Sequence, residues 1–322
     1  MRGPHNLLRL IRTGATLERT GAMGLIMDAM DAPPLVRGTM RFLAWPFQWL
    51  GYRGDPNMPP ALRALTALGP AYIKFGQVFS TRPDIVGDDL ANELRILQDK
   101  LPPFPVTVAK QSVERELGRP VDQMFLEFSE PVAAASIAQV HKARLKDTGE
   151  EVAVKIQLPQ ARSRFKQDSL LFKAVGALGS TLFSQFDLRQ VTEQVISMTM
   201  KELDFLKEEA NLRKFAGLPH PPLIYVPQLF DSHSTSRVIV TEWIEGTKLT
   251  DYLNTNPSKA EGLLRELLRC YVQQITAFGM YHADPHPGNF LVMADGRVAV
   301  LDYGAVGELS SSETQHYAVL LQ

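Results

Sequence analysis

The sequence lacks most features of an extracellular, nucleic-acid-binding or membrane-spanning protein. One cysteine, Cys270, among 322 residues excludes a disulfide framework and favours a reducing compartment. The 34 basic and 35 acidic residues nearly balance, so nucleic acid is not an expected partner. Arg9 and Arg12 interrupt the first apolar stretch, which argues against a cleavable signal peptide. The apolar run after Arg41 is too short to span a bilayer.

A polar cluster near the C-terminal end is the most informative stretch that the chain does contain. The sequence H-A-D-P-H-P-G-N runs from His282 to Asn289 and includes Asp284, and D-Y-G begins thirteen residues later at Asp302. This spacing is typical of phosphoryl-transfer sites. We predict that Asp284 orients the attacking group and that Asn289 and Asp302 bind Mg²⁺, which prefers hard oxygen ligands. The alternative is a His/Pro/Gly-rich turn whose acids are solvated.

The segments around this cluster predict how its side chains are delivered. Apolar residues at helical spacing predict a helix over 261–278, and Gly279 is suited to end it. Two short strands, 290–293 and 298–301, are expected to form a hairpin around an Asp-Gly turn. The second strand would present Asp302.

A strand is predicted upstream at 152–155, where the sequence reads V-A-V-K. Because side chains alternate along a strand, Ala153 and Lys155 share one face. Ala153 would leave room for a flat base, and Lys155 would reach the α- and β-phosphates of a nucleotide. A surface lysine on an amphipathic strand is the alternative interpretation.

A charged segment from Lys201 to Asn211 is predicted to be helical and offers two acids that could pair with Lys155. Glu202 is one candidate and Glu208 is the other. They lie six positions apart and therefore do not share a stripe of a straight helix. The spacing alone leaves the choice between them open.

A β-branched strand at 237–241 leads into E-W-I-E-G, which begins at Glu242. Backbone groups from Glu242 to Ile244 are expected to meet the edge of an adenine, as the hinge of a kinase does. A buried strand that ends in a Gly turn is a compatible description of the same segment.

An alanine-rich segment stands where a glycine-rich phosphate loop would be expected. The residues expected to cover a nucleotide there are Ala133, Ala134, Ala135, Ser136, Ala138 and Val140. Glycine allows backbone N–H groups to approach phosphates closely, whereas the Cβ of alanine removes much of that freedom. Ordinary protein-kinase activity is therefore not expected.

These motifs, taken together, resemble the UbiB family of atypical kinases, which is linked to ubiquinone biosynthesis. The K-x-G-Q signature lies at Lys74–Gln77, and an E-x-D segment lies at Glu202–Asp204. The alanine-rich loop, the H-x-D-x-H-P-G-N loop and D-Y-G complete the set in the same order. The resemblance covers roughly residues 60 to 310.

The resemblance implies an α+β fold with two kinase-like lobes and a helical extension that carries K-x-G-Q. It implies binding of ATP or ADP with Mg²⁺, conditional ATPase activity and poor phosphorylation of proteins in trans. The residues that it places in the catalytic machinery are Asp284, Lys155, Glu202, Lys74 and Gln77. In this family K-x-G-Q folds over the site where a protein substrate would enter, and Glu202 resembles the acid that meets it. Only twenty residues follow Asp302, so a shortened C-lobe is expected.

The N-terminal segment differs in character from the rest of the chain. Between Leu35 and Tyr52, Arg37 and Arg41 are mixed with apolar and aromatic residues, a pattern that suits an interfacial helix. A helix packed on the kinase core is the alternative. We expect a peripheral protein on the cytoplasmic side of a membrane, of the bacterial inner-membrane type, with a lipid or quinone precursor and other ubiquinone-biosynthesis proteins as partners.

Four regions are predicted from these patterns. They are a membrane-proximal segment at 1–58, the K-x-G-Q extension at 59–118, a kinase-like N-lobe with inserted helices at 119–246, and a partial C-lobe at 247–322. Two other functions are compatible with parts of the sequence. One is a nucleotide-sensing scaffold that binds lipids and turns over little. The other is a small-molecule kinase of the aminoglycoside or choline kinase type.

Overall fold

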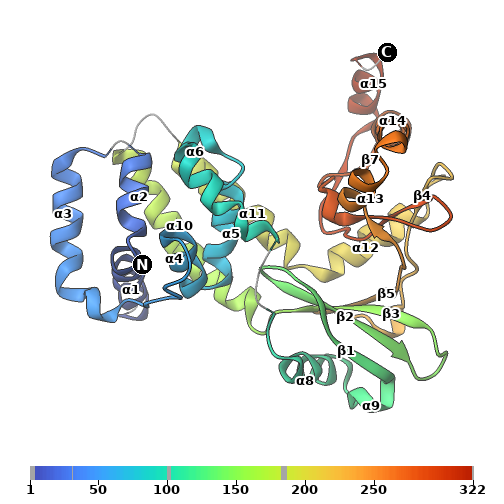
Figure 1. The fold of residues 1–322 in the computed structure, drawn as a ribbon, viewed down its shortest axis with the longest axis horizontal. Helices are drawn as coiled ribbons and strands as arrows, with labels where there is room; N and C mark the ends of the chain where they lie inside the picture. The colour runs from blue at the N-terminus through green and yellow to red at the C-terminus, as the bar shows by residue number, and fades with distance from the viewer. Residues whose placement is uncertain (1–3, 31, 100–102, 183–186, 321–322) are drawn as a thin grey trace. The chain divides into compact units, whose positions relative to one another are not determined.

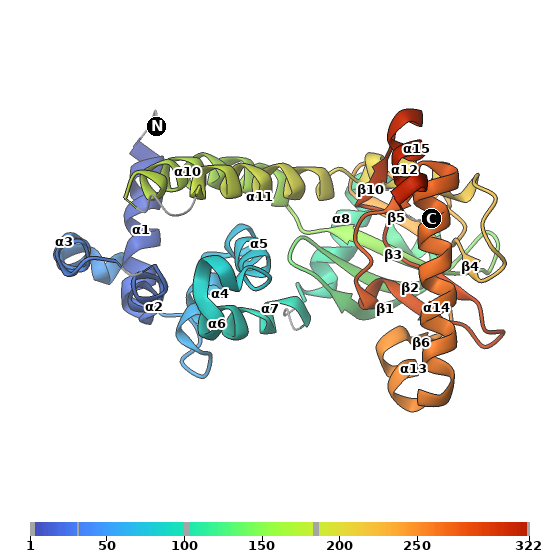
Figure 2. The same ribbon diagram turned by 90° about the horizontal axis from the view of Figure 1, so that it is seen from above.

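The computed structural model describes residues 4–30, 32–99, 103–182 and 187–320, which form two compact units (Figures 1 and 2). We call them the helical unit and the sheet unit. The helical unit comprises Met1–Pro103, Ala134–Ala138 and Leu158–Leu203. The sheet unit comprises Phe104–Ala133, Gln139–Gln157 and Asp204–Gln322. Each unit is described by itself below.

The helical unit is built from helices of moderate length. They are α1 (Pro4–Thr20), α2 (Ala22–Ala29), α3 (Pro34–Ala44), the 3₁₀ segment η1 (Trp45–Leu50), α4 (Pro60–Leu68), α5 (Pro70–Phe79), α6 (Pro83–Leu94), α7 (Ile96–Asp99), α10 (Ala161–Leu182) and α11 (Leu188–Glu202). Proline occupies the first position of α3, α4, α5 and α6. Its fixed φ suits that position, and its missing N–H would be unpaired there in any case.

The predicted K-x-G-Q helix is confirmed as α5, which lies in the middle of this unit. Ile73 packs in a cluster with Leu62, Leu94 and Leu97 from α4, α6 and α7. On another side, the ring of Phe172 from α10 lies 4.0 Å from that of Phe75. The surrounding helices therefore hold α5 on two sides.

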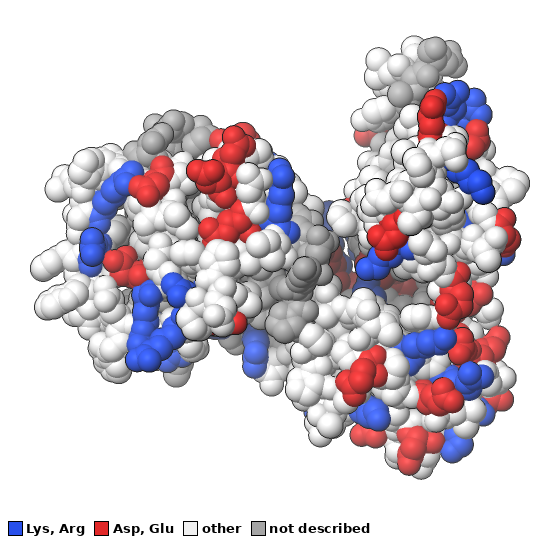
Figure 3. Space-filling model, in the orientation of Figure 1, with Lys and Arg blue, Asp and Glu red and all other residues white. Residues whose placement is uncertain are grey.

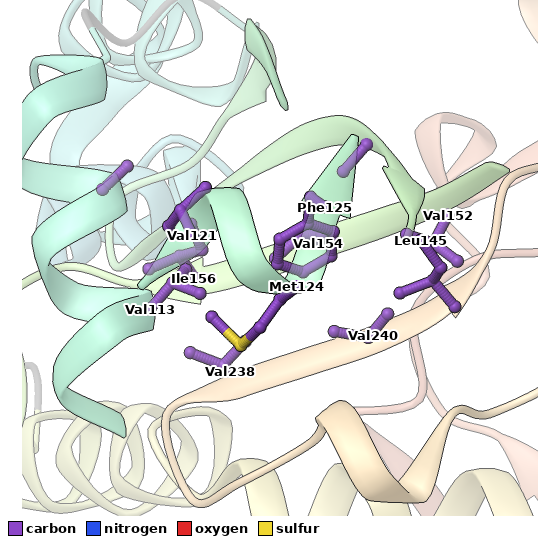
Figure 4. Close-up of a cluster of buried hydrophobic side chains, with 12 residues drawn as sticks. Val113, Val121, Met124, Phe125, Leu145, Val152, Val154, Ile156, Val238 and Val240 are labelled. Carbon is purple, nitrogen blue, oxygen red and sulfur yellow. The ribbon is translucent and has the colours of Figure 1, made fainter. Parts of the chain in front are cut away.

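The sheet unit contains an antiparallel sheet with the strand order β1-β2-β3-β5. Its strands are β1 (Phe125–Ala134), β2 (Ala138–Leu145), β3 (Glu151–Gln157) and β5 (Val238–Glu242). Two helices, α8 (Val106–Leu117) and α9 (Val121–Met124), pack on one face (Figures 1 and 4). Val152, Val154 and Ile156 of β3 are fully buried under them. The predicted alternation along β3 is confirmed, and it turns Lys155 toward the opposite face.

The rest of the sheet unit is mainly helical, with short strands. Its helices are α12 (Phe205–Ala216), η2 (Asp231–His233), α13 (Leu249–Thr255), α14 (Pro257–Gln273), a π-helical turn at Gln274–Phe278, η4 (Pro287–Asn289) and α15 (Ser311–Leu320). Its strands are β4 (Ile224–Tyr225), β6 (Thr247–Lys248), β7 (Met280–His282), β8 (Phe290–Val292), β9 (Val298–Val300) and β10 (Val306–Glu308). A second sheet has the order β4-β9-β8-β6, and β7 pairs with β10.

The predicted helix and hairpin before Asp302 are both confirmed. The helix begins four residues earlier than predicted, at Pro257, and its last turn is π-helical rather than α-helical. Gly279 ends it with φ of +60°, a conformation that glycine adopts without strain. Strands β8 and β9 pair antiparallel through the predicted turn.

The prediction of one continuous helix from Lys201 to Asn211 is wrong. The segment Lys201–Asn211 is not continuous, because α11 ends at Glu202 and α12 begins at Phe205. Leu203 is fully buried at the break, and its position is set by packing rather than by helix propensity. The two candidate acids therefore stand on different helices. In the part of the chain that the structure describes, every helix is too short or too polar to cross a bilayer.

Candidate active site

Three side chains from distant parts of the sheet unit meet at the face of β3 that turns away from α8. Lys155 Nζ lies 2.6 Å from Glu208 Oε1 of α12 and 2.9 Å from Asp302 Oδ2, which follows β9. The Glu208 side chain is only 7% exposed, whereas that of Asp302 is 41% exposed. The pairing partner of Lys155, which the sequence left open, is Glu208, while Glu202 is paired with Lys74.

The three groups shift one another's pKa values. Burial alone would lower the pKa of Lys155, but the two carboxylates raise it above its ordinary value. Burial raises the pKa of Glu208 to about 7, although Lys155 opposes that shift. Burial would also raise the pKa of Asp302, yet the adjacent ammonium group lowers it on balance. The lysine thus stays charged, and the more exposed acid is the one that keeps its negative charge.

Helix α12 holds both acids of this triad in place. It supplies Glu208 directly, and one turn later Asn211 Nδ2 donates a hydrogen bond of 2.9 Å to the carbonyl oxygen of Tyr303. Gly304 N–H donates to Asp302 Oδ1 at 2.8 Å, which fixes the rotation of that carboxylate. Asn211 was not anticipated from the sequence, although its three-residue spacing from Glu208 places the two on one helix face.

The loop after β7 brings together the other predicted residues. Asn289 Nδ2 donates to the carbonyl oxygen of Asp284 at 3.2 Å and to its carboxylate at 3.3 Å. Leu301 N–H donates to the carbonyl oxygen of Asn289 at 2.9 Å, so Asn289 stands next to the residue before Asp302. A ring nitrogen of His282 lies 2.5 Å from the carbonyl oxygen of Asp302. The loop and D-Y-G are therefore tied together at two points.

The residue types at this place suit a magnesium ion. Asp302 would offer a carboxylate and Asn289 an amide oxygen, because the amide nitrogen of Asn289 donates to Asp284. Mg²⁺ is usually held by one or two protein carboxylates together with phosphate oxygens and waters. In the structure Lys155 contacts one of the two Asp302 oxygens. A metal ion at Asp302 would therefore compete with Lys155 for that oxygen.

Two contacts that the sequence did not reveal, one buried and one partly buried, position the loop after β7. The Gln274 side chain, in the π-helical turn, accepts a hydrogen bond of 3.1 Å from His282 N–H. The Tyr271 hydroxyl donates to the carbonyl oxygen of His282 at 2.9 Å. Gln274 is 4% exposed. A π-turn changes which side chain faces the loop, and helical spacing in the sequence carries no sign of it.

At the predicted hinge, part of the backbone is already engaged. Glu242 N–H donates to the carbonyl oxygen of Gln228 at 2.8 Å, and Trp243 N–H donates to that of Glu151 at 3.1 Å. Ile244 is buried. Ala153 lies opposite Thr241 in the β3–β5 pair, on the same face of β3 as Lys155. Binding of a base by Glu242, Ile244 and Ala153 remains a prediction.

The alanine-rich loop is a tight turn between β1 and β2. Ala135 N–H donates to the carbonyl oxygen of Ala138 at 2.8 Å. Ala133 and Ala135 are exposed, Ser136 and Ala138 are buried, and Val140 is half-buried. None of the residues from Ala133 to Val140 has positive φ, as expected when every residue carries a Cβ. Their predicted role in covering a nucleotide remains a prediction.

The K-x-G-Q side chains Lys74 and Gln77 both contact other elements of the helical unit. Lys74 Nζ lies 2.5 Å from Glu202 Oε2 at the end of α11. Gln77 Nε2 donates to the carbonyl oxygen of Leu97 at 2.8 Å. Each side chain thus joins α5 to another element of the same unit. The catalytic role that the resemblance implies for Lys74, Gln77 and Glu202 remains a proposal.

Comparison with known proteins agrees with this arrangement. Residues 96–322 match the family model described as the ABC1 atypical kinase-like domain. A protein of Synechocystis is 42% identical over 276 residues, which cover 81% of this chain and 40% of that protein. The chloroplast protein ACTIVITY OF BC1 COMPLEX KINASE 1 of Arabidopsis thaliana is 37% identical over 262 residues, which cover 78% of this chain and 38% of that protein. The chain thus spans less than half the length of these two relatives.

A solved structure shows the same fold. The protein Rv3197 of Mycobacterium tuberculosis, solved as a complex with erythromycin, superposes with a TM-score of 0.53 at 31% identity. The match covers 75% of this chain and 62% of that one. The predicted kinase-like α+β fold is thereby confirmed. These matches agree with the sequence motifs and with the pairing of Lys155 to Glu208 and Asp302. The chain belongs to the ABC1 atypical kinase-like family, of the UbiB type.

Proposed function

We propose that this protein binds ATP or ADP with Mg²⁺ and acts as an atypical kinase or ATPase. The observation that carries the proposal is the placement of Lys155 between Glu208 and Asp302, at 2.6 and 2.9 Å. The three residues lie up to 147 positions apart in the chain. A lysine paired with a helix acid beside the aspartate of D-Y-G is the arrangement by which kinases neutralise phosphate charge.

Each residue has a distinct part in the proposed reaction. Lys155 would neutralise phosphate charge, and Asp284 would orient the attacking water or hydroxyl group. Asn289 and Asp302 would hold Mg²⁺, which supplies further neutralisation of the phosphate oxygens. Glu208 is a positioning residue, because it contacts only Lys155 among these groups.

The wider role that we propose is support of ubiquinone biosynthesis at a membrane surface. It rests on the UbiB-type motif set, which is linked to that pathway. A peripheral position on the cytoplasmic side, a lipid or quinone precursor as ligand and other ubiquinone-biosynthesis proteins as partners belong to the same proposal. We also propose that Lys74, Gln77 and Glu202 limit access of protein substrates, as K-x-G-Q does in this family.

Phosphate release from ATP in the presence of Mg²⁺ tests the enzymatic proposal. Asp302→Asn removes the metal-binding charge, and we expect the rate to fall by about 100-fold or more. Asp295→Asn is the matched control, because Asp295 is an exposed acid of the neighbouring hairpin turn that pairs with Arg297. Its rate should equal that of the unmodified chain. Equal rates for all three proteins would remove the catalytic role of Asp302.

A nucleotide-sensing scaffold is the second candidate, and the alanine-rich loop favours it. A turn without positive φ offers phosphates fewer backbone N–H groups than a glycine-rich loop does. Calorimetry with and without Mg²⁺ would then show tight nucleotide binding. No phosphate release would follow, even with anionic vesicles and a quinone-precursor mimic. Release stimulated by an aminoglycoside or by choline would instead support a small-molecule kinase.

A further inference from the structure

We propose that the outer face of α3 and η1 is a docking surface for an anionic lipid bilayer. This α3–η1 surface consists of Leu35, Phe42, Leu43, Trp45, Phe47 and Trp49. The inference does not depend on nucleotide chemistry, because every residue that carries it lies in the helical unit, outside the candidate active site.

The apolar side chains of this surface are unusually exposed. Leu35 is 80% exposed, Phe42 75%, Trp45 70% and Trp49 73%. All of them lie on one unbroken stretch of helix, because α3 runs directly into η1. Several large apolar side chains exposed on one short segment of a folded protein mark an interaction site, whereas single exposed apolar residues are ordinary.

The exposed residues lie on a different face of α3 from the one that packs against the rest of the helical unit. Val36 and Met40, one helical turn apart, pack with Met27 and Ala32 in a separate apolar cluster. Leu35 and Phe42 lie on another side of the helix. Helix α3 therefore has one apolar face that stabilises the fold and a second that packing within the helical unit leaves uncovered.

The charge of this region selects a negatively charged partner. Residues 32–54 contain three arginines and no acidic residue. Arg37 pairs with Asp28. The Arg41 side chain is 83% exposed, and its contact with Glu18 joins Nε to Oε1 at 3.7 Å. Figure 3 shows a row of basic side chains on the outer side of the helical unit, with white surface around it and a few acidic side chains next to it.

The surface is supported by α1 and is therefore preformed. Arg19 donates to the carbonyl oxygen of Gly51 at 2.8 Å, and Tyr52 N–H donates to Thr16 Oγ1 at 3.0 Å. Arg12 donates to the Tyr52 hydroxyl at 3.2 Å. Figures 1 and 2 both show α3 on the outer side of α1 and α2. No refolding of this region is needed to present the aromatic rings.

A bilayer fits these features better than a second protein does. Tryptophan, tyrosine and arginine together are typical of the membrane–water interface, where rings sit at headgroup level and guanidinium groups meet phosphates. A helix lying in that plane needs one free apolar face and few acids, and α3–η1 has both. The length of α3 also suits lying on a membrane rather than crossing it.

Quenching of tryptophan fluorescence tests the location of docking. The chain has three tryptophans, and Trp45 and Trp49 lie on the surface while Trp243 lies in the sheet unit. We expect brominated lipids in phosphatidylcholine–phosphatidylglycerol vesicles to quench the full chain. In Trp45→Phe/Trp49→Phe, where Trp243 remains, quenching should disappear while co-sedimentation persists. Quenching that survives in this variant would overturn the proposal.

Vesicle co-sedimentation tests the energetics with matched variants. Phe42→Ser/Trp45→Ser should weaken binding by about 10-fold or more, because it removes two large inserted side chains. Leu264→Ser/Leu268→Ser changes exposed apolar residues of α14, in the sheet unit, and should leave binding unchanged. Pure phosphatidylcholine should bind roughly 10-fold less tightly than anionic vesicles.

Two outcomes would contradict the proposal that α3–η1 docks on a bilayer. Equal loss in both double variants would show that binding does not depend on α3–η1. Absence of vesicle binding, together with self-association of the chain that Phe42→Ser/Trp45→Ser abolishes in sedimentation equilibrium, would assign the surface to a second copy instead. The docking surface rests on the proposed peripheral position at a membrane. Neither result would affect phosphate release, so the docking surface and the enzymatic proposal fail independently.

Discussion

Glu208 and Asp302 share one ammonium group, yet their environments separate them. Glu208 is almost fully buried, and burial raises its pKa from 4.5 to about 7. Asp302 is more exposed, and Lys155 lowers its pKa overall. Two neighbouring acids whose pKa values are shifted in opposite directions are typical of a site in which only one of them must stay ionised. The ionised one here is the proposed metal ligand.

The raised pKa of Glu208 makes a testable contribution to stability. Between the unfolded value of 4.5 and the folded value of about 7, the folded chain binds more protons than the unfolded chain. The stability contributed by Glu208 is therefore complete below the lower value and is lost as the pH rises through about 7, by about 3 kcal/mol. We expect a protonated-carboxyl infrared band with a titration midpoint near 7.

Glu208→Gln is the control for that titration, and its spectrum should lack the band. The difference between the two proteins isolates Glu208 from other carboxyl groups. A band that is already lost at about pH 5 in the unmodified chain would contradict the raised pKa.

Tyr303 carries a buried hydroxyl group that makes no hydrogen bond with the described residues. It is 2% exposed and packs with Phe215, at 5.3 Å between ring centres. Burial, with a smaller effect of Asp302, raises its pKa well above the usual range. Replacing this residue removes an unsatisfied polar group without opening a cavity.

We therefore expect Tyr303→Phe to raise the free energy of unfolding by about 1 kcal/mol. Tyr271→Phe should lower it by about 1 kcal/mol, because the Tyr271 hydroxyl donates to His282. Urea unfolding of the two variants beside the unmodified chain checks both signs. Shifts in the same direction would show that the Tyr303 hydroxyl has a partner.

At the scale of elements, helix α5 shows why the third position of K-x-G-Q is glycine. A Cβ on Gly76 would lie 2.5 Å from a methyl carbon of Leu97 and 2.6 Å from one of Leu65. Two leucine methyl groups from neighbouring helices approach α5 so closely that a side chain at this position would displace them. The motif thus specifies a packing distance as well as the polar contacts of Lys74 and Gln77.

Gly76→Ala should destabilise the helical unit by about 1–3 kcal/mol, because two leucines must move. Gly14→Ala in α1 is the matched control, since nothing lies within 4 Å of the added carbon. That variant should be neutral or more stable, by up to about 1 kcal/mol, because alanine favours helix. Thermal unfolding followed by circular dichroism compares them. Equal melting temperatures for Gly76→Ala and Gly14→Ala would mean that the leucines around Gly76 can move aside without a cost in stability.

The break between α11 and α12 decides which lysine each of the two candidate acids can reach. It separates Glu202, which pairs with Lys74, from Glu208, which pairs with Lys155. In a continuous helix, Glu202 and Glu208 would be held at a fixed distance from each other. Two helices allow each acid to serve a different lysine in a different unit.

At the scale of the whole molecule, the two units divide the proposed tasks. The sheet unit contains the Lys155 triad, and the helical unit contains both the K-x-G-Q helix and the α3–η1 surface. If the sheet unit binds Mg²⁺ with ADP, binding stabilises that unit by about 2.7 kcal/mol at a ligand concentration 100 times the Kd.

Hydrogen exchange should therefore slow in β3, α12 and the segment 284–304 when Mg²⁺ and ADP are added. Amides of α1 to α3 serve as the internal control and should change little. Asp302→Asn should reduce the protection, because the metal ligand is lost. Protection that is confined to the helical unit would contradict the placement of the nucleotide site.

Local patterns in the sequence were enough to predict several parts of the site. Alternation along β3 placed Lys155 opposite the buried valines, and turn residues placed Asp302 at the end of a hairpin. These features depend on neighbours a few positions away, so period and turn chemistry reveal them. No pattern in the sequence predicts the π-helical turn that brings Gln274 to His282. Nor does any pattern predict the helix break at Leu203, a residue that is fully buried in the structure.

The sequence by itself determined the family, the kinase-like fold class and the identity of the charged groups, because ordered motifs and short-range periodicity encode them. Only the tertiary structure decided which acid meets which lysine and which apolar residues of the N-terminal segment remain uncovered. Those outcomes depend on contacts between segments up to 147 positions apart. Distance along a chain says nothing about distance in space until the core has packed.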